Sequence, residues 1–175
     1  MGSSNLLYRL VEDNLKTAPE SVVFIEGDQK ISFQQVDRLC RQKESWLRSQ
    51  GIGSGDTVAM WLVNSTEWLA FFFALARIGA VLAPLNTRYK SHEIGYMIEK
   101  SQPRLLIMQG QFRKIDFIDI FSQVDNSELR SLEKIAFLGA DETLPGSLKG
   151  IAITSTDVPG TESSSERVPD ESNVC

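Results

Sequence analysis

Few residues of this chain have the types and spacing that chemistry requires. The chain holds a single histidine, His92, and two cysteines, Cys40 and Cys175, which lie far apart in the sequence. One imidazole and two distant thiols fit no ligand spacing of a metal site, so none is predicted. His92 falls in the first turn of an expected helix, where neither the pocket nor the orienting partner of a general base is visible. We interpret His92 as a surface residue and identify no catalytic residue.

Three glycines, Gly51, Gly53 and Gly55, superficially suggest a loop that binds phosphate. Dinucleotide sites place G-x-G-x-x-G after a strand and before a helix, so that backbone amides meet the phosphate at the helix N-terminus. Here the run follows an expected helix and leads into an expected strand, which is the reverse order. We interpret it as the C-terminal cap of a helix followed by a turn.

Arg88 is the one residue that we consider for cofactor binding. It lies in residues 85–89, directly after an apolar strand, where α/β proteins often place binding loops. A guanidinium group suits a phosphate or a carboxylate geometrically. The alternative is local pairing that fixes the loop, and we prefer it because most side-chain hydrogen bonds are local.

Four aromatic residues lie close together in one expected helix. They could be imagined as a pocket for an acyl chain, but aromatic residues at helical spacing are far more often core. The four are Trp68, Phe71, Phe72 and Phe73.

Composition and charge narrow the possible functions. The 175 residues are 42% hydrophobic and 23% charged, with a formal net charge of -5, which is typical of one globular domain. The negative charge, with no Lys/Arg stripe on an expected helix, argues against nucleic-acid binding. The longest apolar run, residues 68–76, is shorter than the roughly 20 residues of a membrane span. Few cysteines and no secretory signal indicate a cytoplasmic setting, with organelle targeting by a segment beyond residue 175 as an alternative.

Hydrophobic periodicity predicts alternating helices and strands. Helices are expected at residues 4–16, between 32 and 51, at 64–78, from 91 onward and at 112–124. Strands are expected at residues 21–26, 30–33, 57–63, 80–83, 104–108, 134–138 and 151–154. The alternation predicts an α/β fold, with a layered, mostly parallel sheet and flanking helices. Ligands of such sheets bind at the carboxyl ends of the strands, here near residue 64, residues 85–89 and residues 109–110.

Capping residues predict where several elements begin and end. Ser32 and Gln35 have the spacing of a capping box, and Asn64 and Ser91 are expected to cap the next two long helices. Pro84 lacks a backbone donor and should end its strand. The first helix is expected to bury one apolar face, made of Leu6, Leu7, Leu10, Val11 and Leu15.

Several segments resemble the N-terminal part of the AMP-forming adenylating enzymes, the family of acyl-CoA ligases, luciferases and peptide-synthetase adenylation domains. Residues 51–63, GIGSGDTVAMWLV, look like the family's G-x-x-x-G-D-x-V turn and strand. Residues 76–89 look like its K-x-G-A-V-x-x-P-L-N-x-R segment, and residues 31–36 add to the likeness. Asn86, and Tyr89 without a following proline, favour acyl-CoA or aryl-CoA ligases over peptide synthetases.

The resemblance implies a whole enzyme that joins a carboxylic acid to ATP with Mg²⁺ and then to CoA, as in fatty acid metabolism. The family's phosphate loop with its Lys, its aromatic-Thr-Glu motif, its ribose-binding Asp and its C-terminal Lys find no match here. Residues 163–165 are three serines without a glycine partner or a Lys. No catalytic, cofactor-binding or metal-binding residue is therefore carried over, and the phosphate loop is expected just after residues 168–174.

We thus expect residues 1–160 to be an incomplete N-terminal portion of an adenylating domain and residues 161–175 to be a disordered polar tail. The predicted function is that of an N-terminal fragment of an acyl-CoA ligase, inactive alone and binding no cofactor. One alternative is a non-catalytic fragment that pairs with a full-length ligase, with a protein partner covering the open sheet edge. Another is a small-ligand-binding α/β domain unrelated to adenylation.

Overall fold

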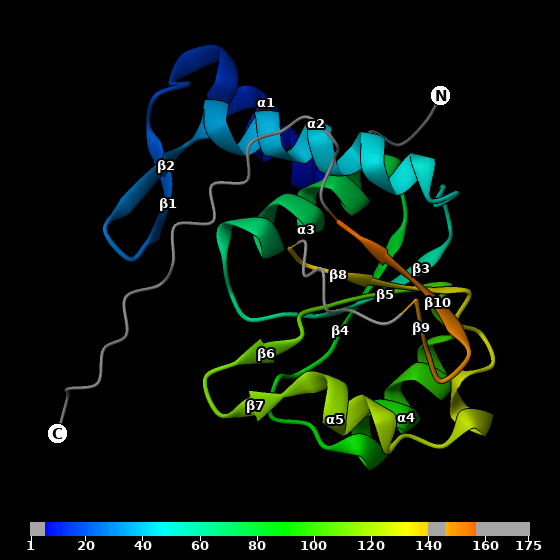
Figure 1. The fold of residues 1–175 in the computed structure, drawn as a ribbon. Helices are drawn as coiled ribbons and strands as arrows, with labels where there is room; N and C mark the ends of the chain where they lie inside the picture. Colours follow the sequence, from blue (N-terminus) through cyan, green and yellow to red (C-terminus); the bar gives the residue numbers. More distant parts are fainter. Residues whose placement is uncertain (1–5, 140–145, 157–175) are drawn as a thin grey trace, which may run out of the picture.

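A six-stranded sheet lies at the centre of the computed structural model, which describes residues 6–139 and 146–156, with helices on both faces (Figure 1). The strand order is β4-β3-β5-β8-β10-β9. Every neighbouring pair is parallel except β10 with β9. The layered, mostly parallel α/β fold predicted from the sequence is confirmed.

The central strands are β3 (Thr57–Trp61), β4 (Val81–Pro84), β5 (Leu105–Met108), β8 (Lys134–Phe137), β10 (Ile151–Ser155) and the short β9 (Ser147–Leu148). The helices are α1 (Leu6–Thr17), α2 (Phe33–Ser49), α3 (Thr66–Ile78), α4 (Ser91–Ser101) and α5 (Phe117–Ser122), with a 3₁₀ turn η1 (Asn126–Leu129) after α5. Two hairpins complete the fold, one of β1 (Val22–Glu26) and β2 (Gln29–Ser32), the other of β6 (Gln111–Phe112) and β7 (Ile115–Asp116).

The central strands serve two cores at once, because successive side chains of a strand point to opposite faces. Toward α2 and α3 the strands contribute Val58, Met60, Leu105, Ile107 and Ala136. Toward α4 and α5 they contribute Ala59, Trp61, Leu106, Met108, Ile135 and Phe137. All of β5 is buried, as expected for a parallel strand covered on both faces. Each fully buried large apolar side chain contributes roughly 1.5–3 kcal/mol to folding.

Helix α3 is the most central helix, as its nearly all-apolar sequence predicts. It packs on the sheet and against α2, and none of its residues is exposed. Gly79 ends it with a left-handed φ of 81°. The chain can then turn directly into β4, because glycine adopts this conformation without steric cost.

The inner face of α1 differs from the prediction. Leu7 and Leu10 are 46% and 61% exposed, while Tyr8 and Val11 are buried. The helix is turned so that Tyr8 faces α2, where its hydroxyl finds the carboxylate of Asp37 as a partner. The predicted face is confirmed at Val11 and at the partly buried Leu15, which pack in the same cluster as Tyr8.

Two predicted helix caps are off by one residue. The N-cap of α3 is Ser65, not Asn64, and its hydroxyl accepts a hydrogen bond from the Trp68 N–H. Lys90 is the N-cap of α4, and Ser91 is the first helical residue. By contrast, the capping box of Ser32 with Gln35 on α2 is confirmed.

The helix predicted at residues 112–124 is wrong in its first part. Residues 111–116 form the β6–β7 hairpin, and α5 covers only Phe117–Ser122. Arg113 adopts a left-handed φ of 55° in the hairpin turn, where no Gly or Asn marks a turn in the sequence. Asp116 then caps α5 through its carboxylate, which ends the hairpin and starts the helix.

The other predicted elements are present with shifts of one or two residues at their ends. Pro84 is the last residue of β4, as predicted. The tail at residues 161–175 lies outside the described residues.

Candidate functional site

The three regions expected to contact a ligand come together at the carboxyl edge of the sheet. Gln109, after β5, is 8% exposed, and its side-chain oxygen accepts a hydrogen bond from the Val63 N–H at 3.1 Å. The indole N–H of Trp61 donates to the carbonyl oxygen of Asn86 at 3.1 Å. These two bonds tie the connections after β3, β4 and β5 into one continuous surface.

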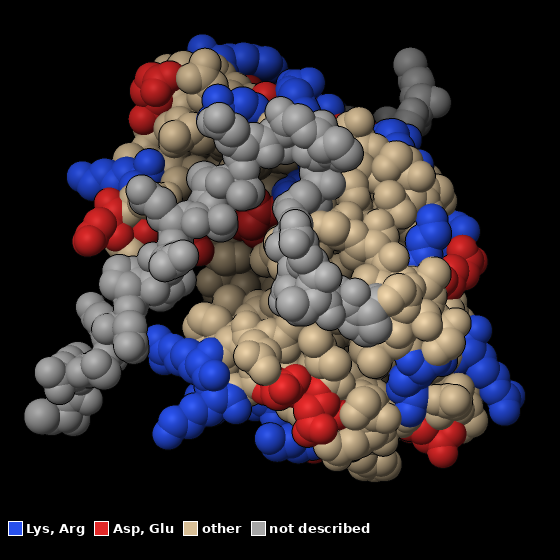
Figure 2. Space-filling model, in the orientation of Figure 1, with Lys and Arg blue, Asp and Glu red and all other residues tan. Residues whose placement is uncertain are grey.

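Positive charge gathers beside this surface over the β6–β7 hairpin (Figure 2). Arg113 and Lys114 form the hairpin turn, and both are exposed. The guanidinium of Arg113 lies 5.3 Å from the ring centroid of Phe112. The turn could attract anions, although exposure to solvent weakens such an attraction.

The N-terminus of α3 is a natural anion site at this edge, but the protein's own carboxylate occupies it. An oxygen of Glu26, from the β1–β2 hairpin, accepts a hydrogen bond from the Thr66 N–H at 2.9 Å. The Ser65 hydroxyl oxygen accepts a hydrogen bond from the Trp68 N–H at 3.1 Å. A helix dipole favours negative charge at this position, and Glu26 supplies it.

The N-termini of α4 and α5 also have a carboxylate beside them, but at α4 it bonds to the N–H of the N-cap residue and not to an N–H of the first turn. An oxygen of Glu93 accepts a hydrogen bond from the Lys90 N–H at 3.0 Å. The carboxylate of Asp116 accepts one from the Asp119 N–H at 2.9 Å, and this bond holds the pKa of Asp116 below its usual value. Near the carboxyl edge, therefore, the helix starts that could receive a phosphate already carry carboxylates.

Arg88 lies on the surface at this edge. Its side chain is exposed, and its backbone N–H donates to the side-chain oxygen of Asn86 at 2.9 Å. Asn86 therefore helps to hold this loop, and both interpretations of the Arg88 guanidinium stay predictions. Arg88 thus lies in the connection after β4, at the carboxyl edge of the sheet.

The glycine run lies at the opposite, amino edge of the sheet. Gly51 and Gly55 have left-handed φ values of 83° and 85°. The Gly53 N–H donates to Asp56 at 2.8 Å, and the Gly55 N–H donates to the Gly79 carbonyl at 2.9 Å. The run is therefore a cap and a turn whose amides are used within the fold.

His92 and the aromatic residues of α3 also have defined places. His92 is exposed in the first turn of α4. Phe71 is fully buried between α3 and the sheet, and Trp68 stacks on Phe72 with centroids 5.5 Å apart. Phe73 packs into the cluster below α1. The interpretation of these rings as core side chains holds best for Phe71, since the other three are partly exposed.

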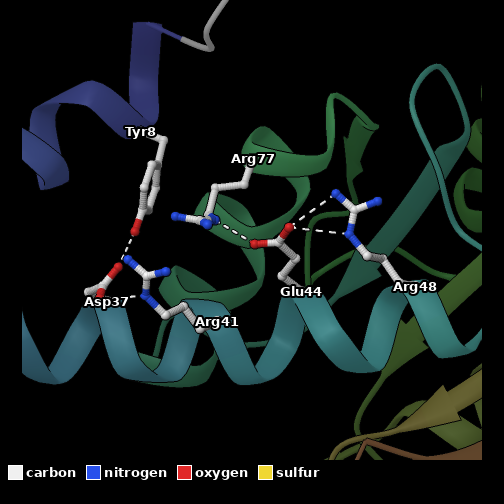
Figure 3. A network of polar contacts seen from close by, with 6 residues as sticks. All are labelled: Tyr8, Asp37, Arg41, Glu44, Arg48 and Arg77. Carbon is white, nitrogen blue, oxygen red and sulfur yellow. Dashed lines mark hydrogen bonds and ion pairs between the residues drawn. The ribbon is translucent and has the colours of Figure 1, made fainter.

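Sequence reasoning missed a polar network between α1, α2 and α3 (Figure 3). The Tyr8 hydroxyl donates to Asp37, and the Arg41 guanidinium contacts the same carboxylate at 2.8 Å. Burial raises the pKa of Asp37, but the bonds from Arg41 and Tyr8 outweigh it and hold that pKa below its usual value. Burial and the neighbouring Asp37 raise the pKa of Tyr8, so the phenol remains the donor.

Arg77 joins the second half of this network. Its guanidinium lies 4.3 Å from the Tyr8 ring centroid and pairs with Glu44 at 2.5 Å. Glu44 also pairs with Arg48 at 3.1 Å. Burial raises the pKa of Glu44, but the Arg77 and Arg48 bonds lower it by more. Apart from the pairs within α2, the contacts join residues far apart in the sequence, so no local signal reveals them.

An ion pair between α2 and α3, buried at Lys43 but with the Glu67 side chain 35% exposed, was also missed. Lys43 lies on the inner face of α2 and is 8% exposed. Its ammonium nitrogen lies 2.5 Å from an oxygen of Glu67 and 5.0 Å from the Phe71 ring centroid. Lys43 thereby joins the two helices that cover one face of the sheet.

Within residues 6–139 and 146–156, no cluster of His, Cys, Asp and Glu side chains is suited to hold a metal ion. The same part of the chain contains no helix that is long and apolar enough to cross a membrane.

Similarities to known proteins concern nearly the whole chain. A family model described as AMP-binding enzyme matches residues 11–172. The Bacillus subtilis protein YngI, named as an acyl-CoA synthetase, is 38% identical over 143 residues, which are 81% of this chain and 24% of YngI. The human mitochondrial medium-chain acyl-CoA ligase ACSF2 is 25% identical over 83% of this chain and 26% of its own length.

Solved structures share the fold. The anthranilate CoA ligase AuaEII, in complex with anthranoyl-AMP, matches 87% of this chain and 28% of its own with a TM-score of 0.69 at 24% identity. This chain therefore spans about a quarter of the length of the relatives that it matches.

Proposed function

This chain belongs to the family of AMP-binding enzymes, and from that premise we propose that it is the N-terminal scaffold of an AMP-forming acyl-CoA ligase. The 38% identity to a relative named as an acyl-CoA synthetase supports this subfamily. In the proposal, residues 1–160 form the first part of the adenylating domain. The whole enzyme would use a carboxylic acid, ATP with Mg²⁺, and CoA.

We further propose that this chain alone does not adenylate a carboxylic acid. The observation that carries this proposal is the carboxylates at the helix N-termini near the ligand edge. Glu26 and Asp116 accept hydrogen bonds from first-turn N–H groups of α3 and α5, and Glu93 accepts one from the N-cap of α4. Adenylation places developing negative charge on a pyrophosphate leaving group, which needs donors aimed at it. Helix starts that already hold carboxylates would repel that group instead.

The test compares two proteins, this chain and a version extended by its downstream coding sequence to the length of the relatives. Acyl-adenylate is trapped with hydroxylamine over a panel of carboxylic acids with ATP and Mg²⁺. We expect hydroxamate from the extended protein and none above background from this chain. Adenylation by this chain alone would contradict the proposal.

A binding measurement separates lack of turnover from lack of a nucleotide site. Specific binding at a ligand concentration 100 times Kd stabilises a protein by about 2.7 kcal/mol, which raises its melting temperature. We expect ATP with Mg²⁺ to leave the melting temperature of this chain unchanged. If ATP raised it and Arg88→Ala abolished the rise, Arg88 would be a nucleotide-binding residue.

Strand β4 lies at the edge of the sheet, but its backbone offers a partner strand few free N–H groups. The N–H groups of Val81 and Leu85 point toward the β3 side of the strand. They donate hydrogen bonds to the backbone carbonyl oxygens of Asp56 and Met60. Because alternate residues face opposite sides, position 84 faces outward, and proline has no N–H to offer there. A partner that covers the sheet edge remains a prediction, as does the cytoplasmic location.

A further inference from the structure

Helix α1 is attached to the molecule through a core of its own. The buried members of this cluster come from α1, α2 and β2, and none belongs to the central six-stranded sheet. They are Tyr8, Val11, Ile31, Val36 and Cys40. Loss of α1 would therefore leave the two cores of the sheet intact.

The attachment of α1 is also thin. Among residues 7–17, Tyr8 and Val11 are the buried side chains, while Leu7 and Leu10 point to solvent. The neighbours of α1 are α2 and α3. Elements with few buried apolar contacts open at a lower free energy than the global unfolding of the protein.

A polar latch holds this thin contact closed (Figure 3). The Tyr8 hydroxyl donates to Asp37 on α2, and Arg77 on α3 lies 4.3 Å from the centroid of the Tyr8 ring. Arg77 is itself held by Glu44 at 2.5 Å. One side chain of α1 thus connects to both helices below it.

Cys40 lies beneath this latch. It is 0% exposed, and it sits three residues after Asp37 and four before Glu44, which places all three on one side of α2. It shares its cluster with Tyr8 and Val11. Burial is the main cause that raises the pKa of the Cys40 thiol to about 12, and the negative charge of Asp37 adds to it. The thiol is therefore unreactive while α1 is closed.

We propose that α1 is a latched strap that opens from α2 and α3 while the central sheet stays folded, and that its opening uncovers the Cys40 thiol. The Tyr8 hydroxyl is the latch, and the state of the strap can be read from the accessibility of this thiol. The inference is independent of the proposed ligase function, because it concerns packing within this chain alone.

The test measures the rate at which a disulfide reagent, DTNB, modifies Cys40 in the native protein, with Cys175→Ser present so that one thiol reports. Tyr8→Phe removes the hydroxyl and keeps the ring for Arg77. We expect it to speed modification about tenfold or more, the effect of losing a hydrogen bond to a charged acceptor. Leu10→Ala changes the exposed face of α1 and should leave the rate within about twofold.

A third variant distinguishes strap opening from global unfolding. Ile135→Val weakens the core on the far face of the sheet. We expect it to lower the urea midpoint but to leave the modification rate of Cys40 unchanged. If Ile135→Val speeds modification as much as it lowers global stability, and Tyr8→Phe does no more than that, the thiol is reached only by global unfolding and the strap does not exist.

Hydrogen exchange of the unmodified protein provides a second measurement that needs no variant. We expect the amides of α1 to exchange faster than those of β5, and with a weaker dependence on urea. Equal protection and equal urea dependence in the two elements would overturn the proposal.

Discussion

Gly79 illustrates how one residue decides a local turn. Its φ of 81° favours glycine, and a Cβ there would lie 2.9 Å from the Ser54 hydroxyl oxygen. The backbone conformation and the close contact with Ser54 therefore both disfavour any residue with a Cβ at position 79. The short step from α3 into β4, and with it the placement of Arg88 near the ligand edge, depends on this position.

We predict that Gly79→Ala lowers the free energy of unfolding by about 1–2 kcal/mol, the cost of a left-handed conformation for a residue with a Cβ. Urea denaturation followed by circular dichroism measures the change. Gly53→Ala is the matched control, because a Cβ at Gly53 would meet its nearest atom, an oxygen of Asp56, at 3.8 Å. Equal losses for the two variants would show that the backbone conformation of Gly79 is not the cause.

At the scale of elements, the start of α3 connects the hairpin, the helix and the ligand edge. Ser65 caps the helix, and Glu26 from β1 binds the Thr66 N–H. The two oxygens satisfy donors that a helix leaves unpaired at its N-terminus. This same pairing is what closes the site to an external anion.

Ser65→Ala should lower the free energy of unfolding by about 1 kcal/mol, the usual cost of removing an N-cap hydroxyl. Asn64→Ala, one residue earlier, should change it by less than about 0.5 kcal/mol, because Asn64 is exposed and is not the cap. Thermal and urea denaturation of both variants decide between the two positions. A larger loss for Asn64→Ala would restore the cap assignment made from the sequence.

At the scale of the whole molecule, charge pairs join the amino ends of the strands. Arg104 pairs with Asp56 at 2.9 Å and with Glu133 at 2.8 Å, which ties the start of β5 to the segments before β3 and β8. The hydrogen bond from the Gly53 N–H has the largest effect on the pKa of Asp56, and the bond from Arg104 adds to it. Together they hold this pKa below its usual value. The Arg104 bond does the same for Glu133.

These lowered pKa values predict acid sensitivity. A carboxyl group whose pKa is lower in the folded than in the unfolded state adds stability above its unfolded pKa, which is about 4, and this stability is lost as the pH falls through the folded pKa. We expect the urea midpoint to stay constant between pH 6 and 7 and to decrease when the pH is lowered below about 4. Asp56→Asn should be less stable than the wild type at pH 7 and converge toward it in acid. Parallel curves at all pH values would contradict this account.

The sequence determined much of the fold because its signals are local. The apolar run of β5, the capping box of Ser32 with Gln35 and the glycine at position 79 each define an element from within a few residues. The family likeness drew on residues 31–36 and 76–89, which contain the last two of these signals, and on residues 51–63. The β6–β7 hairpin was missed because its turn is made by Arg113 and Lys114, which carry no turn signal.

Only the tertiary structure decided how the elements use their polar side chains. Glu26 lies 40 residues before Thr66, and Tyr8 lies 29 residues before Asp37, so neither pairing has a local periodicity to reveal it. These contacts turn α1, close the N-terminus of α3 to anions and bury Cys40. Sequence patterns indicate which residues can be buried. Which polar groups then contact one another depends on packing between elements that lie far apart in the sequence.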